Sequence, residues 1–278
     1  MRRLYQLTSK SKWLSAPYAL WSVIFIIIPL GMILYYGLTD KTGAFTLDNI
    51  IAITTAGHAK ALRLSVLLSL VSTLICFLLA YPLAMILANT KTNKHHFIIL
   101  IFILPMWMNF LLRTLAWQTL LEKNGVINSV LTFLNLPNLK IINTPAAIVL
   151  GMVYNFLPFM ILPLYNALAK IDKNVINAAH DLGAGSVYTF IRIILPLSVP
   201  GIISGITMVF VPALTTFVIS ALLGGSKLLL IGDVIEQEFT RTSNWHLGSG
   251  LSIVLMIFIV INMIASAIFD KDGEGSML

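Results

Sequence analysis

Charge is scarce in this sequence. Only 10% of its 278 residues are Asp, Glu, Lys or Arg, whereas 58% are hydrophobic. A soluble globular domain carries about 25% charged residues, so the composition excludes an ordinary soluble protein. The apolar runs extend over nearly the whole chain and leave no stretch long enough for a separate soluble domain. We therefore predict a single all-α, polytopic membrane domain.

Cysteines and clustered metal ligands are also nearly absent. The single cysteine, Cys76, lies in an apolar run, which excludes an intramolecular disulfide and a cysteine-cluster metal site and predicts a buried, small apolar side chain. The histidines are dispersed, so we predict no metal site. They are His58, His95, His96, His180 and His246.

Other function classes are disfavoured by what the sequence lacks. The net charge is +7, but the basic residues are scattered and form no stripe interleaved with aromatics, which argues against nucleic acid as a partner. No set of ionisable residues suggests an enzyme acting on lipid, and no Gly-x-x-x-x-Gly-Lys-Ser/Thr loop would bind ATP. We expect neither catalysis nor a bound cofactor in this chain. A channel that works alone remains an alternative.

Six apolar segments are long enough to cross a bilayer core about 30 Å thick. The first follows four basic residues, but its apolar run is too long for a secretory signal and no small-residue cleavage site follows it. Because Lys and Arg are enriched on the side of the N-terminus, we predict that both termini are cytoplasmic. The segments are 17–38, 59–88, 97–121, 146–168, 197–223 and 248–269.

A polar stretch, NAAHDLGAGSVYTFIRIILP (177–196), lies between the fourth and fifth segments. Asp172 is placed to cap a short helix, and Gly183 stands where a left-handed residue would end it. Ser186 is placed to cap a second helix that Pro196 would interrupt. The residues predicted to share one face in each helix are Val175, Ala178, Ala179 and Leu182, then Val187, Phe190, Ile191 and Ile194.

This helix–turn–helix is too short and too polar to span a membrane. Its weakly apolar face beside small residues suits docking into a shallow cleft on another protein. An amphipathic helix lying on the membrane surface has the same pattern. The pattern alone leaves both interpretations open.

The stretch resembles the motif of ABC importer permeases, which reads Glu-Ala-Ala, three residues, Gly, nine residues, then Ile-x-Leu-Pro. Asn177 replaces the motif's Glu, which removes a carboxylate that could pair with a basic group on a partner. The resemblance implies that the stretch docks on a cytoplasmic ATPase subunit. The candidate coupling residues, including two that are chosen for their place on the docking helix, are Asn177, Ala178, Ala179, His180, Asp181, Gly183, Ile193, Leu195 and Pro196.

Further stretches are similar to the B-type permease subunit of spermidine/putrescine importers: LPMWMNFLLRTLAW (104–117), TPAAIVLGMVYNFLPFMILPLYNAL (144–168), DLGAGSVYTFIRIILPLSVPGI (181–202) and LLGGSKLLLIGDVI (222–235). The resemblance implies a type I ABC importer permease fold with six transmembrane helices. Residues 1–58 would form the cytoplasmic N-terminus, first helix and external loop. Residues 59–269 would form the transmembrane core, with coupling helices at 172–196, and 270–278 a cytoplasmic tail.

The same resemblance implies an assembly in a bacterial cell membrane. It would contain a homologous sister permease, two copies of an ATPase that uses ATP and Mg²⁺, and an external polyamine-binding protein. Spermidine and putrescine are the implied cargo. A different small solute remains an alternative, because a coupling motif does not choose a substrate.

A linear polyammonium cargo would favour acceptor oxygens, carboxylates and aromatic faces along its path. The alternatives are interhelical packing for the neutral polar residues, interfacial anchoring for the aromatics and solvation of an exposed loop for the acids. Arg113 would repel a cation, so we expect it to pair internally, cap carbonyls or lie near the outer interface. The candidate pathway residues are Trp107, Asn109, Trp117, Tyr154, Asn155, Thr215, Thr216, Ser220, Asp233, Glu236 and Glu238.

Overall fold

The computed structural model describes residues 16–89, 102, 104–225 and 228–275. Within these ranges the fold is all-α, and the only extended pairing is an isolated bridge between Thr39 and Phe45. The chain divides into two compact units. Among the described residues, the first comprises 16–55 together with Ile235–Met256, and the second comprises those between Ala56 and Val234 together with 257–275.

Five helices in the described ranges are long and apolar enough to cross a membrane. They correspond to five of the six predicted segments and run over Pro17–Gly37, Ala56–Asn89, Pro145–Ala169, Ser186–Thr215 and Trp245–Ile268. Residues 97–101 and 103 of the remaining predicted segment lie outside the described residues.

The first unit contains α2 (Ala16–Ser22), the π-helical turn η1 (Val23–Ile27), α3 (Ile28–Gly37), α4 (Asp48–Ile51), η2 (Ala52–Thr54) and the first part of α15 (Trp245–Gly275). Within this unit, the start of α15 packs closely against the residues that follow α3. His246 Nδ1 lies 2.7 Å from the Thr39 carbonyl oxygen, and a Cβ at Gly250 would lie 2.5 Å from the Asn49 carbonyl oxygen. Its remaining apolar surface is exposed, as suits a helix in lipid.

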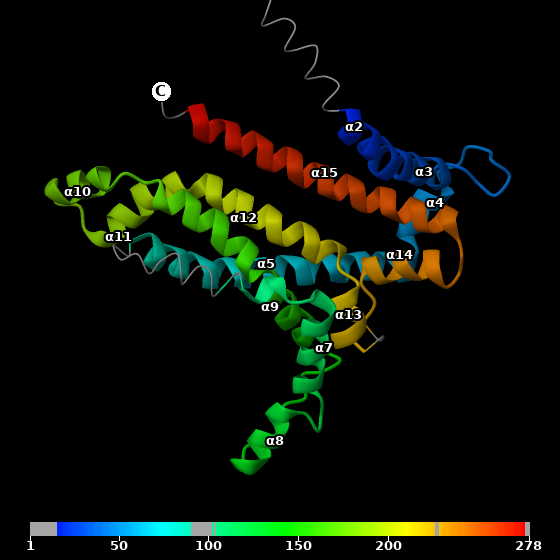
Figure 1. Ribbon diagram of the computed structural model, residues 1–278, viewed down its shortest axis with the longest axis horizontal. Helices are drawn as coiled ribbons and strands as arrows, with labels where there is room; N and C mark the ends of the chain where they lie inside the picture. The colour runs from blue at the N-terminus through cyan, green and yellow to red at the C-terminus, as the bar shows by residue number, and fades with distance from the viewer. Residues whose placement is uncertain (1–15, 90–101, 103, 226–227, 276–278) are drawn as a thin grey trace, which may run out of the picture. The chain divides into compact units, whose positions relative to one another are not determined.

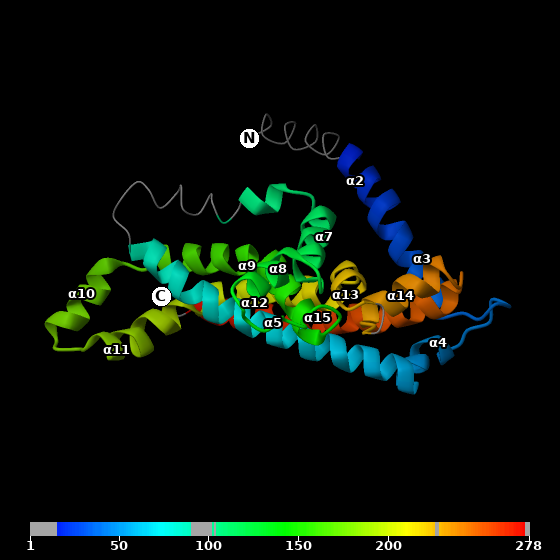
Figure 2. The same ribbon diagram turned by 90° about the horizontal axis from the view of Figure 1, so that it is seen from below.

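The second unit is built on α5 (Ala56–Asn89), α9 (Pro145–Ala169) and α12 (Leu195–Thr215), which lie side by side and enclose its core (Figures 1 and 2). Small residues permit this packing. Gly201 of α12 lies so close to α9 that an added Cβ would be 2.8 Å from the Pro163 carbonyl oxygen. In a bilayer, burying apolar side chains between helices gains little, because lipid tails are just as apolar. Helices there associate through the close packing that small residues allow. Cys76 is fully buried here, as predicted.

The helix of the fifth predicted segment begins earlier than expected, because Pro196 does not interrupt it. Helix α11 (Ser186–Thr189) continues through the π-helical turn η4 (Phe190–Ile194) into α12. A proline ring clashes with the carbonyl four residues earlier in a regular α-helix. The wider π turn, in which the Leu195 N–H donates to the Phe190 oxygen five residues back, avoids this clash. Likewise, η1 directly precedes Ile28 and Pro29.

Two predicted segments are not single helices. The third contains the 3₁₀ turn η3 (Leu104–Trp107) and α7 (Phe110–Leu121), separated at Met108 and Asn109. The fifth breaks after Thr215 and resumes as α13 (Val218–Leu223). In Figure 1, α7 and α8 (Val126–Phe133) lead away from the bundle of α5, α9 and α12. Helices α10 (Lys173–Asp181) and α14 (Ile231–Thr240) complete the described elements.

Candidate functional site

The polar stretch after α9 forms the predicted helix and glycine turn. Asp172 caps α10 by accepting a hydrogen bond from the Asn174 N–H at 2.9 Å. Gly183 has a φ of +83°, the left-handed conformation that was predicted. The Gly183 N–H donates to the His180 oxygen, and the Ala184 N–H donates to the Ala179 oxygen, both at 2.9 Å. These two bonds form a Schellman motif, which gives the turn a defined geometry.

The second cap differs from the prediction. Gly185 is the N-cap residue of α11, and it makes no side-chain capping bond. Ser186 is instead the first helical residue, so the prediction that it caps the helix is wrong. The hydroxyl of the buried Thr189 donates to the Gly185 oxygen at 3.2 Å and holds the start of the helix.

The surface of this stretch is apolar at its turn. Leu182 is 90% exposed, and Val187 and Tyr188 are also exposed. Large exposed apolar side chains beside a polar helix are typical of a protein-binding surface. The predicted common face of α10 is not buried as a whole, because Ala179 is buried whereas Val175 is exposed.

The coupling candidates occupy two places. Asn177, Ala178, His180 and Asp181 are exposed on α10, and the His180 ring nitrogen Nδ1 lies 3.0 Å from the Ala184 oxygen. Ile193 and Leu195 are half-buried and Pro196 is exposed, and these three lie at the junction of η4 with α12. The first group can contact a partner directly, whereas the second group builds the joint between the turn and the bundle.

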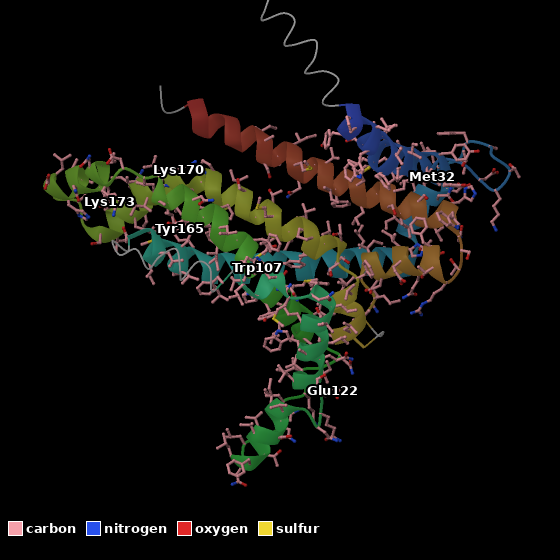
Figure 3. The ribbon with its side chains drawn as sticks, in the orientation of Figure 1. Met32, Trp107, Glu122, Tyr165, Lys170 and Lys173 are labelled. Carbon is pink, nitrogen blue, oxygen red and sulfur yellow. The ribbon has the colours of Figure 1, made fainter. Side chains whose placement is uncertain are left out.

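That joint connects the stretch to α5. The Phe190 ring lies edge-on to the Tyr81 ring, with centroids 5.8 Å apart. The Tyr81 hydroxyl forms a buried hydrogen bond of 2.8 Å with Ser198 Oγ. Figure 3 places Lys170 and Lys173 at the connection between α9 and α10. The stretch is therefore continuous with α9 and α12 along the chain, and it contacts α5 through Phe190.

Among the pathway candidates, the structure brings Trp117 and Tyr154 together. Their ring centroids are 5.2 Å apart, with planes at 68°. Trp107 is 79% exposed and lies at the start of the segment that leads into α7 (Figure 3). Asn109 is the N-cap of α7, and its Oδ1 accepts the Leu111 N–H at 2.9 Å. The Asn109 side chain therefore stabilises the start of α7.

The neutral polar candidates are mostly engaged within their own helices. Thr215 and Ser220 donate to carbonyl oxygens of their own segments, and Thr216 is 9% exposed. Asn155 is 1% exposed and donates from Nδ2 to the Gly151 oxygen at 2.8 Å. Its Oδ1 has no hydrogen-bond partner in the structure as described. The hydroxyl groups of Thr215 and Ser220 are therefore satisfied locally.

The three acidic candidates lie on α14, not in a loop. Asp233 is buried, which corrects the expectation of a solvated loop residue, and its Oδ2 accepts the Leu230 N–H at 2.8 Å. This bond caps the start of α14. Glu236 and Glu238 are half-buried and accept hydrogen bonds from Thr240 and Thr242 one turn later.

Sequence reasoning missed the role of Ser65 in this region. Its buried hydroxyl oxygen accepts the Ile231 N–H at 2.8 Å, so α5 satisfies the first backbone N–H of α14. No local pattern indicates a contact between residues 166 positions apart. In the described ranges, no three His, Cys, Asp or Glu side chains are grouped to hold a metal ion.

Comparison with known sequences gives a family match over most of the chain. The model of the family described as "Binding-protein-dependent transport system inner membrane component" matches residues 49–271. A curated relative is the "Spermidine/putrescine transport system permease protein PotB" of Escherichia coli (strain K12). It is 36% identical over 266 residues, which cover 91% of this chain and 97% of the relative.

Two solved structures share the fold. One is a bacterial ABC transporter involved in the import of the acidic polysaccharide alginate, with a TM-score of 0.78 and 17% identity over 97% of this chain and 99% of that chain. The other is a bacterial alginate ABC transporter in complex with an alginate pentasaccharide-bound periplasmic protein. Its TM-score is 0.76, with 16% identity over 95% of this chain and 96% of that chain.

Proposed function

Because the chain belongs to the family of binding-protein-dependent transport system inner membrane components, we propose that it is the polyamine-translocating permease subunit of an ATP-driven ABC importer. The observation that carries the coupling role is the turn at Gly183, which presents Leu182, Val187 and Tyr188 on a defined backbone. The name of the Escherichia coli relative supports spermidine and putrescine as cargo.

The partners follow from this role. A homologous sister permease completes the membrane pathway, and two copies of a cytoplasmic ATPase bind and hydrolyse ATP with Mg²⁺. An external binding protein delivers the polyamine, a partner class supported by the alginate transporter solved with a periplasmic protein. The chain lies in a bacterial cell membrane with both termini in the cytoplasm. Lys170 at the end of α9 and Lys173 at the start of α10 support this orientation, because cytoplasmic connections are enriched in basic residues.

The transport mechanism is alternating access. Closure of the two ATPases on ATP displaces α10, which docks in a groove on one of them. Since η4 and α12 continue from the docking turn without a break, and Phe190 contacts Tyr81 of α5, the displacement reorients these helices as a group. The cavity shared with the sister permease then opens outward to receive cargo, and hydrolysis returns it to the inward-open state.

Cargo recognition is proposed for the residues with accessible rings and oxygens. Trp107, Trp117 and Tyr154 supply ring faces for ammonium groups. Glu236 and Glu238 supply carboxylates near the external entrance. The proposed pathway set is completed by Asn109, Asn155, Thr215, Thr216, Ser220 and Asp233. The local hydrogen bonds of all of these except Thr216 make them supports of the pathway's walls.

The acidic residues separate these two roles experimentally. Replacing Glu236 and Glu238 together with Gln should weaken uptake or binding-protein docking without reducing the amount of assembled complex. Asp233→Asn should instead lower thermal stability, because a neutral amide oxygen is a weaker cap for the Leu230 N–H. Wild-type uptake and docking in the Gln double variant would assign both glutamates to the surface of α14 alone.

The function itself is tested by uptake. Vesicles containing this chain, its co-encoded sister permease, the ATPase and the binding protein should take up labelled spermidine and putrescine when ATP is supplied. Vesicles with an ATPase-dead complex should not. If the ATPase responds to the binding protein loaded with another solute and no polyamine enters, the cargo proposal is refuted and the coupling role stands. Conduction by the purified chain alone would favour a channel and refute the importer.

A further inference from the structure

Arg113 is an unusual residue in the described fold, because it is a cation buried in an apolar segment. It lies on α7 and is 7% exposed. Burying a guanidinium without compensation is costly, so a buried arginine in a membrane protein ordinarily has a defined partner. The sequence contains no Asp or Glu between Asp48 and Glu122, so no nearby carboxylate in the sequence provides one.

One compensating contact is a backbone carbonyl. Arg113 Nη1 donates to the Pro105 oxygen at 2.8 Å, as one of the sequence-based alternatives predicted. Pro105 lies in η3, on the other side of the break at Met108 and Asn109. The guanidinium therefore joins the two parts of a segment whose helical hydrogen bonding is interrupted between them.

The second contact is an aromatic ring. Arg113 Cζ lies 5.9 Å from the centroid of the Tyr154 ring on α9. Trp117, one turn after Arg113 on α7, contacts the same tyrosine at 5.2 Å between centroids. Residues four apart on a helix lie on one face, so the tyrosine ring is held by a cation and an indole from the same face of α7.

The two contacts of the guanidinium group set the orientation of the Arg113 side chain. Its Nε is buried and has no hydrogen-bond partner in the described part of the chain. Neither the Pro105 carbonyl nor the Tyr154 ring carries a formal charge. Both contacts depend on direction and distance, because one planar guanidinium group must reach the Pro105 oxygen with an N–H group and the Tyr154 ring face at the same time. A lysine cannot reproduce both.

We propose that Arg113 is a positioning residue of the translocation pathway, which ties the break at residues 104–109 to the Trp117–Tyr154 pair and sets the orientation of its rings. The inference rests on the proposed function, since the pair is the proposed platform for cargo. Arg113 itself does not touch cargo. Its contact with the Tyr154 ring holds the Trp117 and Tyr154 rings in a fixed arrangement.

The test is a double-variant cycle in the complete importer reconstituted in vesicles. Arg113→Met, Arg113→Lys, Tyr154→Leu and the Met/Leu double variant are compared with wild type, and Arg63→Met serves as a matched control because Arg63 is an exposed arginine on α5. The readout is the number of cargo molecules taken up per ATP hydrolysed, with the amount of assembled complex measured in parallel.

We expect Arg113→Met to lower this ratio about tenfold, which is about the factor that corresponds to the free energy of one desolvated cation–π contact. Arg113→Lys should recover part of the loss, and Arg113→Met should add little in the Tyr154→Leu background. Arg63→Met should match wild type. An unchanged ratio in Arg113→Met, or independent effects that multiply in the double variant, would each overturn the inference.

The same cycle distinguishes failure of this inference from failure of the proposed cargo. A wild-type complex that carries another solute and no polyamine refutes the cargo assignment. The ratio measured for that solute in the same set of variants then supports the role of Arg113 if the cycle is non-additive, and overturns it if the effects multiply.

Discussion

Replacing Gly183 with valine tests the coupling turn most directly, because a nearby glycine provides a matched control. Gly183 has a φ of +83°, whereas Gly185 has a φ of −72°. An added Cβ at either position would meet no heavy atom within 4 Å. The two substitutions therefore add the same side chain to open space and differ mainly in the backbone conformation that it must adopt.

The magnitude follows from the competition at the turn. A non-glycine residue held in the left-handed region costs about 1–3 kcal/mol, and a β-branched residue is disfavoured there most. The two hydrogen bonds of the Schellman motif, donated by Gly183 and Ala184, are worth about 2 kcal/mol together. Strain and stabilisation are thus comparable, so a large share of Gly183→Val molecules should lose the defined turn.

The assay is ATP-dependent uptake by the reconstituted importer, with binding-protein affinity for cargo as an internal control. Gly183→Val should reduce uptake several-fold without changing that affinity, and Gly183→Asn should be milder because Asn tolerates the left-handed conformation. Gly185→Val should retain most of the uptake, since its φ suits any residue. Equal uptake by Gly183→Val and Gly185→Val, at equal amounts of assembled complex, would refute the proposal that this turn couples the ATPase to transport.

Three further predictions concern stability and pH. Gly201→Ala should lower the melting temperature more than Gly205→Ala, because its Cβ would meet the α9 backbone whereas that of Gly205 would meet a flexible methionine tip; overpacking costs about 1–3 kcal/mol, and equal melting temperatures would contradict this. Tyr81→Phe should cost about 1 kcal/mol in thermal unfolding by removing the bond to Ser198, and adding Ser198→Ala should cost little more if that bond accounts for the effect. The Thr42 hydroxyl donates a hydrogen bond to Asp40 Oδ1, which lowers the pKa of the Asp40 carboxyl below its usual value. The contribution of this bond to stability is therefore present above the ordinary aspartate pKa and is lost as the pH falls through the lowered one. An NMR titration of the Thr42 amide should show this loss, and Asp40→Asn should abolish the titration.

Local sequence patterns were sufficient for the turn because all of its interactions lie within a few residues. Asp172 bonds to Asn174, two positions away, and Gly183 needs only its own backbone freedom. The length and apolarity of the spans were predictable for a similar reason, since the bilayer thickness alone sets them. The same local logic failed at Pro196, where a π-helical turn accommodates the ring and the helix continues.

What the sequence by itself determined is the class of protein, five described spans, helix α10 and its left-handed turn, because each depends on composition or on neighbouring residues. Only the tertiary structure decided the bond from Ser65 to the start of α14, the burial of Asp233 beside it and the pairing of Arg113 with Tyr154. These contacts join residues on different helices, and in a bilayer buried polar groups must find partners wherever packing brings them together. The spacing of residues in the sequence therefore does not predict which of them form these contacts.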